Sequence, residues 1–332
     1  MPAANRQKSG AMRAVRWWSG PVAAFALLAL LRAVLPLPFA NEIVLFSIYA
    51  IGCNFLLGHV GLLSFGQPAY LAVGAYGTAL YLYYVGANPY IGILVGVAAG
   101  IAVAIPVGAL FVRLRRDYFA LINLALAVII FYLMQDVFAT VTHGDDGLLF
   151  MNNLADTPVL DLTRPGQFFV FVLLVGFAVW VFYKYLDDSV FGACCLATRI
   201  NEDKLRFLGY NDFEIRLVAF VIANTTTALS GAMFAVYLGF VSPELGGPSR
   251  AAEPVVVTIL GGVGSLYGPI VGAVAYIGVK DLLSKAFANW ELLVGILLVV
   301  VMLAGEKGIW GSLELLLARV RLGAGRKKAT PR

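Results

Sequence analysis

The sequence predicts an all-α polytopic membrane protein with about eight transmembrane helices, further broken or re-entrant segments, and both termini in the cytoplasm. Of its 332 residues, 61% are apolar and 13% are charged, whereas soluble domains are about 45–50% apolar and about 25% charged. The mean hydropathy of +0.86 also favours lipid as the main solvent. This composition excludes a water-soluble enzyme, a disordered chain and a nucleic-acid binder. The net charge is +5, and the basic residues lie at the predicted membrane edges.

The apolar segments can be assigned in order along the chain. Residues 1–20 carry basic residues and no acid, and we expect them to form a cytoplasmic N-terminus. The apolar run 21–40 is long for a signal peptide and leads directly into another apolar segment, so we interpret it as an uncleaved first helix. The further apolar segments are 42–58, 66–86, 90–112, 118–139, 167–186, 217–240, 255–285 and 290–305. We expect one transmembrane domain over 21–306, followed by an amphipathic and basic cytoplasmic tail over 307–332.

The positions of lysine and arginine predict the orientation, because cytoplasmic loops keep an excess of these residues. The basic residues concentrate in the N-terminus, at 113–116, between Lys184 and Arg216, and in the tail from Arg319. The loops 140–166 and 241–254 are acidic or mixed. The rule therefore predicts that 187–216 is a cytoplasmic loop and that 140–166 is a periplasmic loop.

The segment 255–285 is too long for a single simple span, and a glycine-rich turn interrupts it. The loop before it is predicted outside and the basic tail inside, so 255–285 must return to the outer side before 290–305 crosses. We therefore expect a re-entrant hairpin whose turn lies near the permeation route, because non-helical backbone at membrane depth must be buried in protein or line a cavity. The residues assigned to this turn are Gly261, Gly262, Gly264, Ser265, Gly268 and Pro269.

Small residues recur at every fourth position on two predicted helices. One stripe consists of Gly92, Gly96, Gly100, Ala104 and Gly108, and the other of Gly264, Gly268 and Gly272. Such stripes let helix backbones approach closely in a membrane. We expect them to serve tight packing inside one subunit, and a subunit interface is the alternative.

The sequence carries no motif for enzymatic chemistry. It contains no GxxxxGK[ST], HExxH or GxSxG run, so phosphate cradling, a zincin site and a nucleophile elbow are not predicted. Two histidines and three cysteines indicate neither a metal centre nor a disulfide framework. Ionisable residues are few within the predicted spans, which argues against a carrier powered by its own ion coupling.

The polar residues of the predicted spans are mostly neutral. Pro68 interrupts an apolar region and frees a backbone carbonyl, and a second patch surrounds Thr225–Thr227. A kinked helix with local hydrogen bonds, and hydrogen bonds between helices for the second patch, are the structural interpretations. The functional interpretation is a translocation path for a polar solute, with candidates Asn54, Ser64, Gln67, Tyr70 and Asn224.

The cytoplasmic loop 187–216 is long for such an economical chain. Residues Thr198–Leu208 combine helix formers, mixed charge and apolar side chains at Ile200, Leu205 and Leu208. Gly209 suits the position after a helix end. We predict one short amphipathic helix here, lying either on lipid headgroups or in a groove of another protein.

Several runs together resemble the permeases of the branched-chain amino-acid ATP-binding-cassette (ABC) importers, over about residues 42–311. The matching features are Asn54 with Gly-Leu-Leu-Ser-Phe-Gly-Gln at 61–67, Ala-Tyr at 69–70, Gly-Ala-Tyr at 74–76, Gly-Phe-Val-Ser-Pro at 239–243, and the glycine-rich run 261–273. The run Gly-Asp-Asp-Gly-Leu at 144–148 resembles the M-type of the two paralogous permeases.

The resemblance implies a coupling helix that sits in a cleft of the ATPase subunit. The family pattern maps onto Arg199, Asn201, Glu202, Leu208 and Gly209. The chain departs from that pattern where Lys204-Leu205 replaces an alanine pair and Arg206 replaces a common acid.

The resemblance further implies a multi-pass subunit of a bacterial inner (plasma) membrane, paired with a paralogous permease. Two cytoplasmic ATPase subunits would use the ATP, so this chain needs no cofactor, and a periplasmic solute-binding protein would face Asp145 and Asp146. The solute would be a branched-chain amino acid, although permeases of this family also import urea, short amides and other small organic solutes. A self-sufficient secondary transporter, and a membrane-embedded enzyme that uses Asp145 and Asp146, are the alternatives of other classes.

Overall fold

The computed structural model describes residues 36–114, 116–156 and 160–286, together with positions 25, 28, 292–293, 295–296 and 308–312. The predictions for the N-terminus 1–20, for most of the first helix 21–40, and for most of 290–305 and 307–332 lie outside the described residues. The helices are α2 (Leu37–Phe55), α3 (Gln67–Leu80), α4 (Pro89–Phe111), α5 (Arg116–Tyr132), α6 (Ala139–Thr142), α7 (Pro165–Asp187), α8 (Val190–Ile200), α9 (Glu202–Phe207), α10 (Asp212–Leu238), α11 (Glu253–Gly261) and α12 (Gly268–Ala286).

Three π-helical turns lengthen helices α2, α3 and α5, at Leu56–Val60, Tyr81–Val85 and Leu133–Val137 respectively. Two strands, β1 (Leu148–Leu149) and β2 (Phe240–Val241), pair antiparallel with Leu148 opposite Val241. Within the described residues, the all-α prediction is therefore confirmed apart from this short pairing, which ties the loop 140–166 to the end of α10.

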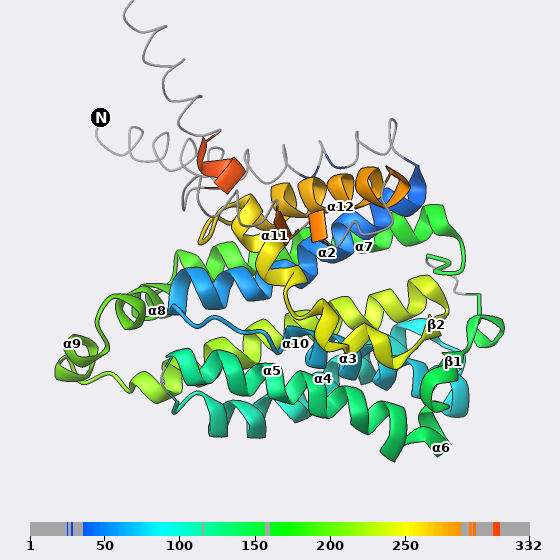
Figure 1. Cartoon of the computed structure of the whole chain (residues 1–332), viewed down its shortest axis with the longest axis horizontal. Coiled ribbons are helices and arrows are strands. Elements are labelled where there is room, and N and C mark those ends of the chain that lie inside the picture. Colours follow the sequence, from blue (N-terminus) through cyan, green and yellow to red (C-terminus); the bar gives the residue numbers. More distant parts are fainter. Residues whose placement is uncertain are drawn as a thin grey trace, which may run out of the picture.

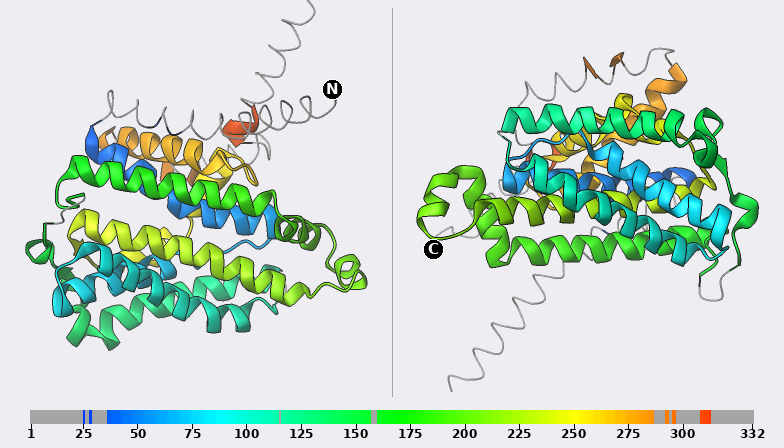
Figure 2. Two further views of the ribbon diagram at one scale, coloured as in Figure 1. Left: turned by 180° about the vertical axis from the view of Figure 1, so that it is seen from behind. Right: turned by 90° about the horizontal axis from the view of Figure 1, so that it is seen from below.

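The long helices run lengthwise in a bundle (Figures 1 and 2). Helix α10 lies between two groups, since it contacts α3 and α4 on one side and α2 on the other, while α2 in turn contacts α7, α11 and α12. Helices α8 and α9 project at one end of the bundle, and β1, β2 and α6 lie at the opposite end (Figure 1). We call these the α8–α9 end and the β1–β2 end.

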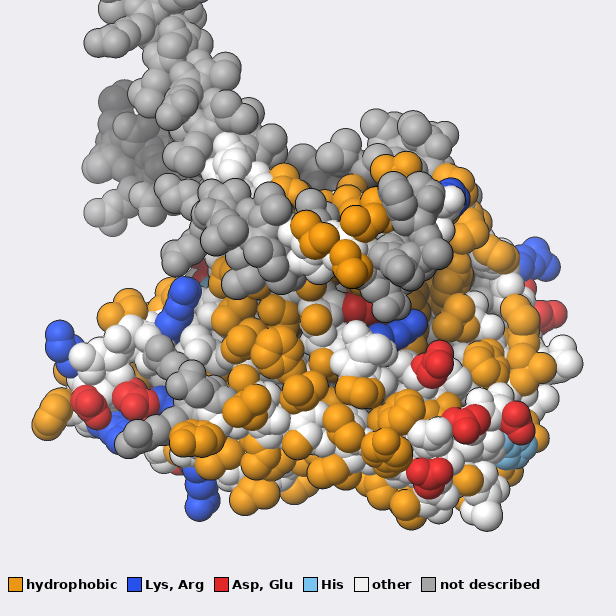
Figure 3. All heavy atoms as spheres, viewed as in Figure 1, with side chains coloured by type: hydrophobic (Ala, Val, Ile, Leu, Met, Phe, Trp, Pro, Cys, Tyr) orange, Lys and Arg blue, Asp and Glu red, His pale blue; other side chains and the backbone are white. Residues whose placement is uncertain are grey.

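Five helical segments of the described part are long and apolar enough to cross a membrane: Leu37–Val60, Pro89–Phe111, Tyr118–Val137, Pro165–Asp187 and Asp212–Leu238. Apolar side chains cover the middle of the face in Figure 3, and charged side chains gather mostly toward the two ends. An apolar belt between charged ends is the surface expected of a multi-pass membrane protein.

The region around Pro68 contains two helices and not one kinked helix. The first helical stretch ends at Val60, and Gly61 adopts a left-handed conformation with φ 76°. Residues 62–66 are not helical, and α3 begins at Gln67 with Pro68 in its first turn. Proline is tolerated there because the first turn has no helical acceptor for its missing N–H. The interpretation of Pro68 as a kink is therefore wrong.

The segment 255–285 is broken at the predicted glycine turn. Helix α11 ends at Gly261, and α12 begins at Gly268 and runs back past the start of α11, where the Tyr276 hydroxyl donates to Glu253 Oε1 at 3.3 Å. Lys280 Nζ lies 3.5 Å from Glu42 Oε1 near the first turns of α2. The expected reversal of direction is confirmed, and α12 ends at the β1–β2 end.

The glycine stripe of α4 packs inside the subunit. A Cβ atom built on Gly96 would lie 2.3 Å from the carbonyl oxygen of Gly74 in α3, and one on Gly100 would lie 2.2 Å from the Cβ of Ala228 in α10. These contacts confirm packing inside one subunit. The alternative prediction, that this stripe of α4 forms a subunit interface, is therefore wrong.

The loop 187–216 forms two helices, so the single helix predicted over Thr198–Leu208 is wrong. Asn201 is extended between α8 and α9, and its side chain accepts a hydrogen bond from the backbone N–H of Lys204 at 3.1 Å. Asparagine competes with helix continuation by capping a new helix. Of the predicted apolar face, Leu205 is buried, whereas Ile200 and Leu208 are exposed.

Candidate functional site

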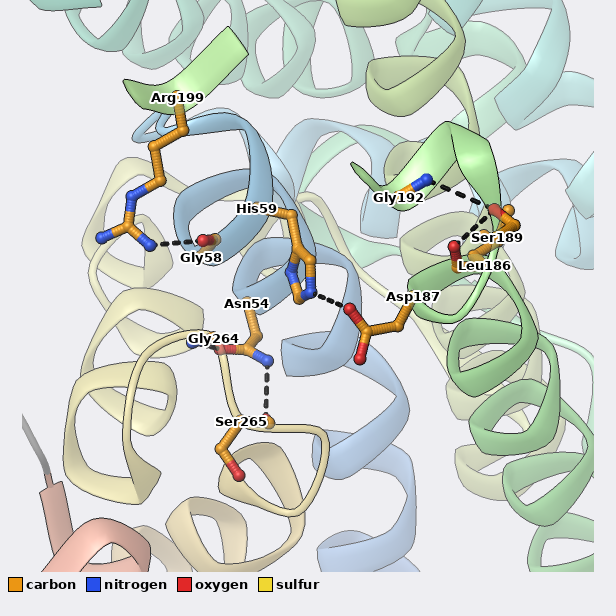
Figure 4. A network of polar contacts seen from close by, with 10 residues as sticks. All are labelled: Asn54, Gly58, His59, Leu186, Asp187, Ser189, Gly192, Arg199, Gly264 and Ser265. Carbon is orange, nitrogen blue, oxygen red and sulfur yellow. Dashed lines mark hydrogen bonds and ion pairs between the residues drawn. The ribbon is translucent and has the colours of Figure 1, made fainter. Parts of the chain in front are cut away.

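Two groups of polar residues lie at functionally suggestive places in the bundle. The first, which we call the end network, joins α2, α7, α8 and the glycine turn near the α8–α9 end. It consists of Asn54, Gly58, His59, Asp187, Arg199, Gly264 and Ser265 (Figure 4). The second, which we call the amide cluster, lies at the start of α3 and consists of Gln67, Tyr70, Asn123 and Asn224.

Asn54 holds the glycine turn in place. Its Nδ2 donates to the carbonyl oxygen of Ser265 at 2.9 Å, and its Oδ1 accepts from the N–H of Gly264 at 2.8 Å (Figure 4). The side chain is almost fully buried. Both halves of the amide are thus used by the turn.

Gly58 contacts both the loop 187–216 and the glycine turn. The Arg199 guanidinium donates to the carbonyl oxygen of Gly58 (Figure 4). A Cβ atom built on Gly58 would lie only 2.4 Å from the Cα of Gly264, so only glycine allows this approach. The π-helical turn Leu56–Val60 therefore connects α8 to the turn between α11 and α12.

A contact between His59 and Asp187 and a helix cap fix the start of the loop 187–216. His59 Nε2 lies 2.8 Å from Asp187 Oδ1 at the end of α7. The Ser189 hydroxyl donates to the carbonyl oxygen of Leu186 at 2.6 Å and accepts from the N–H of Gly192 at 3.3 Å (Figure 4). Helices α7 and α8 are thereby tied to the end of α2.

Helix α9 is held on α10 by charge and presents an apolar tip. Glu202 pairs with Arg216, and Arg216 Nε lies 3.0 Å from Asp212 Oδ1. The Phe207 and Leu208 side chains are 90% and 75% exposed. Gly209 has φ 85°, as a residue following a helix end commonly does. The predicted coupling residues thus surround an exposed projection at one end of the bundle.

Gln67 and Tyr70 contribute two polar groups to the amide cluster. The Thr227 hydroxyl donates to Gln67 Oε1, whereas Gln67 Nε2 has no partner among the described residues. The ring of Tyr70 packs edge-on against Phe220 at 5.8 Å between centroids. Its hydroxyl likewise meets no donor or acceptor in the described part of the chain.

Asn123 and Asn224 contribute two more polar groups to the amide cluster. Each donates its Nδ2 to the carbonyl oxygen four residues earlier, at 2.8 Å to Phe119 and 2.9 Å to Phe220. Each Oδ1 is buried and accepts no hydrogen bond from a described residue. Asn123 was not predicted, because the segment 118–139 is otherwise almost uniformly apolar, although a lone asparagine in such a segment was a usable signal.

The remaining predicted residues lie near these groups or at the far end. Ser64 is buried. Its hydroxyl oxygen accepts a long hydrogen bond of 3.4 Å from the backbone N–H of Gly66. Asp145 and Asp146 lie in a short 3₁₀ turn toward the β1–β2 end, are exposed, and Asp145 accepts from Gln135 Nε2 at 2.7 Å. The bundle therefore separates the acidic pair from the α9 tip.

Comparison with known proteins identifies relatives of the whole bundle. Residues 35–303 match the family model of the branched-chain amino acid transport system permease component. The chain is 29% identical to the high-affinity branched-chain amino acid transport system permease protein LivM of Salmonella typhimurium, over 91% of this chain and 77% of that one. It is 27% identical to the LivM protein of Escherichia coli K12, over 81% and 68% of the two chains.

The high-affinity branched-chain amino acid transport system permease protein LivH of Escherichia coli K12 is 24% identical to this chain, over 81% of this chain and 92% of its own length. No solved structure matches the chain. The similarity thus extends over most of the described helices, including both polar groups.

Proposed function

We propose a function from one premise: the chain belongs to the family of permease components of branched-chain amino acid transport systems, and it is a multi-pass ABC permease. We infer that it forms one half of a heterodimeric pore in a bacterial inner membrane, with a paralogous permease as the other half. The observation that carries this proposal is the family match over 35–303, together with a relative of each permease type.

Two cytoplasmic ATPase subunits would bind and hydrolyse ATP, and their motion would act on α9. The exposed Phe207 and Leu208 side chains suit a protein groove, and the Glu202–Arg216 pair would make α9 move as a unit with α10. Arg199 would pass the motion to Gly58 and so to the glycine turn. This chain would hold no cofactor of its own and would catalyse no reaction.

A periplasmic binding protein would deliver the solute at the β1–β2 end, facing Asp145 and Asp146. The names of the relatives support branched-chain amino acids as the solute, and urea, short amides or other small organic solutes are the alternative within the family. The path would use the neutral residues Ser64, Gln67, Tyr70 and Asn224, since a lining without full charges suits a solute of zero net charge.

A self-sufficient secondary transporter is the rival of another class. Glu42, Lys280 and Glu253 lie near one another beside α12, and this ionisable group was not predicted from the sequence. Such a transporter would accumulate solute from an ion gradient alone, with no ATPase attached. Co-purification in mild detergent separates the two: we expect an ATPase subunit to remain bound, and a stable lone protein would contradict the proposal.

The variant Glu202→Lys tests the coupling role. It breaks the pair with Arg216 and places a second cation beside that residue, so α9 loses its position on α10. We expect ATP-driven uptake to fall by about tenfold, within the usual range of coupling between two sites, while the amount of chain in the membrane stays unchanged. Glu214→Lys is the matched control, because it reverses an exposed charge at the same end but outside α9. Normal uptake by Glu202→Lys would contradict the coupling role.

A further inference from the structure

The four members of the amide cluster are all 0% exposed, yet each has a polar atom that meets no partner in the described part of the chain: Gln67 Nε2, Tyr70 Oη, Asn123 Oδ1 and Asn224 Oδ1. A buried polar atom without a partner destabilises a fold, and native proteins rarely tolerate one. Four such atoms around one place indicate that something else supplies the partners.

The cluster lies inside the bundle at the start of a helix. Helix α3 begins at Gln67, which is bonded to Thr227 near the middle of α10. A helix that starts within the depth of a bundle directs its positive N-terminal dipole at that point. In membrane transporters such interrupted helices bind the polar groups of solutes.

Contacts between the elements bring the four side chains together. The ring of Tyr70 packs on Phe220, whose carbonyl oxygen accepts from Asn224. A Cβ atom built on Gly66, next to Gln67, would lie 3.0 Å from Asn123 Oδ1. The ring of Phe119, from the turn before Asn123, also packs on Phe220 at 5.8 Å between centroids. The cluster thus surrounds the first turn of α3, with two aromatic rings beside it.

The free atoms divide into two donors and two acceptors. Gln67 Nε2 and the Tyr70 hydroxyl can donate, and the Oδ1 atoms of Asn123 and Asn224 can only accept. Two donors suit a carboxylate and two acceptors suit an ammonium group. The cluster contains no full charge, which matches a solute whose two charges cancel, and the phenylalanine rings suit an apolar side chain.

We propose that the amide cluster binds the main-chain ammonium and carboxylate of an α-amino acid with an apolar side chain during its passage. The inference rests on the proposed function and adds a defined site with Asn123 as a member. A primary amide shares part of this chemistry, since it also presents N–H donors beside a carbonyl acceptor. The experiment therefore compares leucine with acetamide.

The test uses the complete importer in proteoliposomes: this chain, its permease partner, the ATPase subunits and the binding protein. Tyr70→Phe removes only a hydroxyl that has no partner among the described residues, so it should not destabilise the fold. Asn224→Leu removes an acceptor at similar volume. Tyr49→Phe and Asn41→Leu are matched controls, because both residues are equally buried, also carry polar atoms without a described partner, and lie in α2 outside the cluster.

We expect Tyr70→Phe and Asn224→Leu each to lower the rate of leucine uptake by about tenfold, as for one lost hydrogen bond to a charged group. Thermal stability and ATPase association should be unchanged, and the two controls should transport at the wild-type rate. Wild-type rates for both cluster variants, or equal losses in the controls, would overturn the site. Uptake of acetamide but not leucine by the wild type would overturn the amino-acid assignment. Absence of any ATP-driven uptake by the wild type would contradict the proposed function itself.

Discussion

Helices α2 and α5 have nearly the same mean hydropathy but opposite surroundings. In the most apolar window of Leu37–Val60, 94% of the residues are buried, against 22% for Tyr118–Val137. Helix α2 contacts α7, α10, α11 and α12, whereas α5 packs mainly on α3 and exposes Tyr118, Leu121, Ile129 and Tyr132. Hydropathy therefore reports that a segment belongs in a membrane, and not whether it lies inside the bundle.

Side-chain size and neutral polarity separate the two helices. On α2, Gly52 and Gly58 allow backbones of α10 and the glycine turn to approach, and Asn54 supplies hydrogen bonds across the interface. The outward face of α5 carries large apolar side chains, while its inward face carries Asn123, the one asparagine of that helix. Small and neutral polar residues thus mark surfaces between helices.

The largest loss of stability is expected from Gly52→Val in the buried helix α2. A Cβ atom on Gly52 would lie 2.5 Å from the backbone oxygen of Ala223, so valine must push α2 away from α10. We expect a loss of about 1–3 kcal/mol in the free energy of unfolding, measured by thermal or denaturant unfolding in detergent. Ala125→Val on the exposed face of α5 should leave stability unchanged. Equal losses would erase the distinction between the helices.

A smaller loss is expected from Asn54→Leu, which tests whether α2 positions the glycine turn. Leucine cannot replace the bonds to Gly264 N–H and Ser265 C=O. Because both turn residues are only half-buried, water can replace part of these bonds, and we expect a loss of about 1 kcal/mol in the free energy of unfolding. Hydrogen exchange at Gly264 should accelerate. Asn41→Leu is the control at an equally buried position on the same helix. Unchanged protection of Gly264 would show that the turn is held by other contacts.

The smallest effect concerns α7. Only 33% of the residues in its most apolar window are buried, a share close to that of α5. Unlike α5, the start of α7 is anchored by polar contacts. Hydrogen bonds from the Thr163 hydroxyl and N–H, together with nearby Arg164, hold the pKa of Asp161 below its usual range. The ionised carboxylate therefore stabilises this loop at neutral pH, and that stabilisation is lost as the pH falls through the lowered pKa.

The protection factor of the Thr163 amide, its intrinsic exchange rate divided by its observed rate, should fall on acidification from about pH 7 to about pH 3, with little change in global stability. In Asp161→Asn this protection factor should be low and should not change with pH. A wild-type protection factor that stays constant over this pH range would contradict the anchoring role.

Much of the fold followed from local signals in the sequence. The break in 255–285 was predictable because four glycines, a serine and a proline fall together within 261–269 and the charge rule requires a reversal there. The break after Val60 was misjudged, because a proline suits both a kink and a first helical turn, and Gly61 and Gly66 decide in favour of the second. The helix split at Asn201 depends on one side chain capping α9, which an amphipathic pattern does not reveal.

The candidate site was less accessible to sequence reasoning. Neutral polar residues could be collected as a class, but the pattern could not tell that Asn54 is fully used by the turn while Gln67 and Tyr70 keep unpartnered atoms within the described structure. Those differences depend on contacts between segments more than 100 residues apart, such as Asn54 with Ser265 and Gln67 with Thr227. The coupling residues and the acidic pair stay predictions.

The central claim is that this permease moves a small zwitterionic solute only when ATPase subunits drive it. The most direct measurement is uptake of labelled leucine by proteoliposomes that contain the assembled importer and its binding protein, with and without ATP on the ATPase side. We expect accumulation that requires both ATP and the binding protein. Accumulation driven by an ion gradient in the absence of ATP would contradict it.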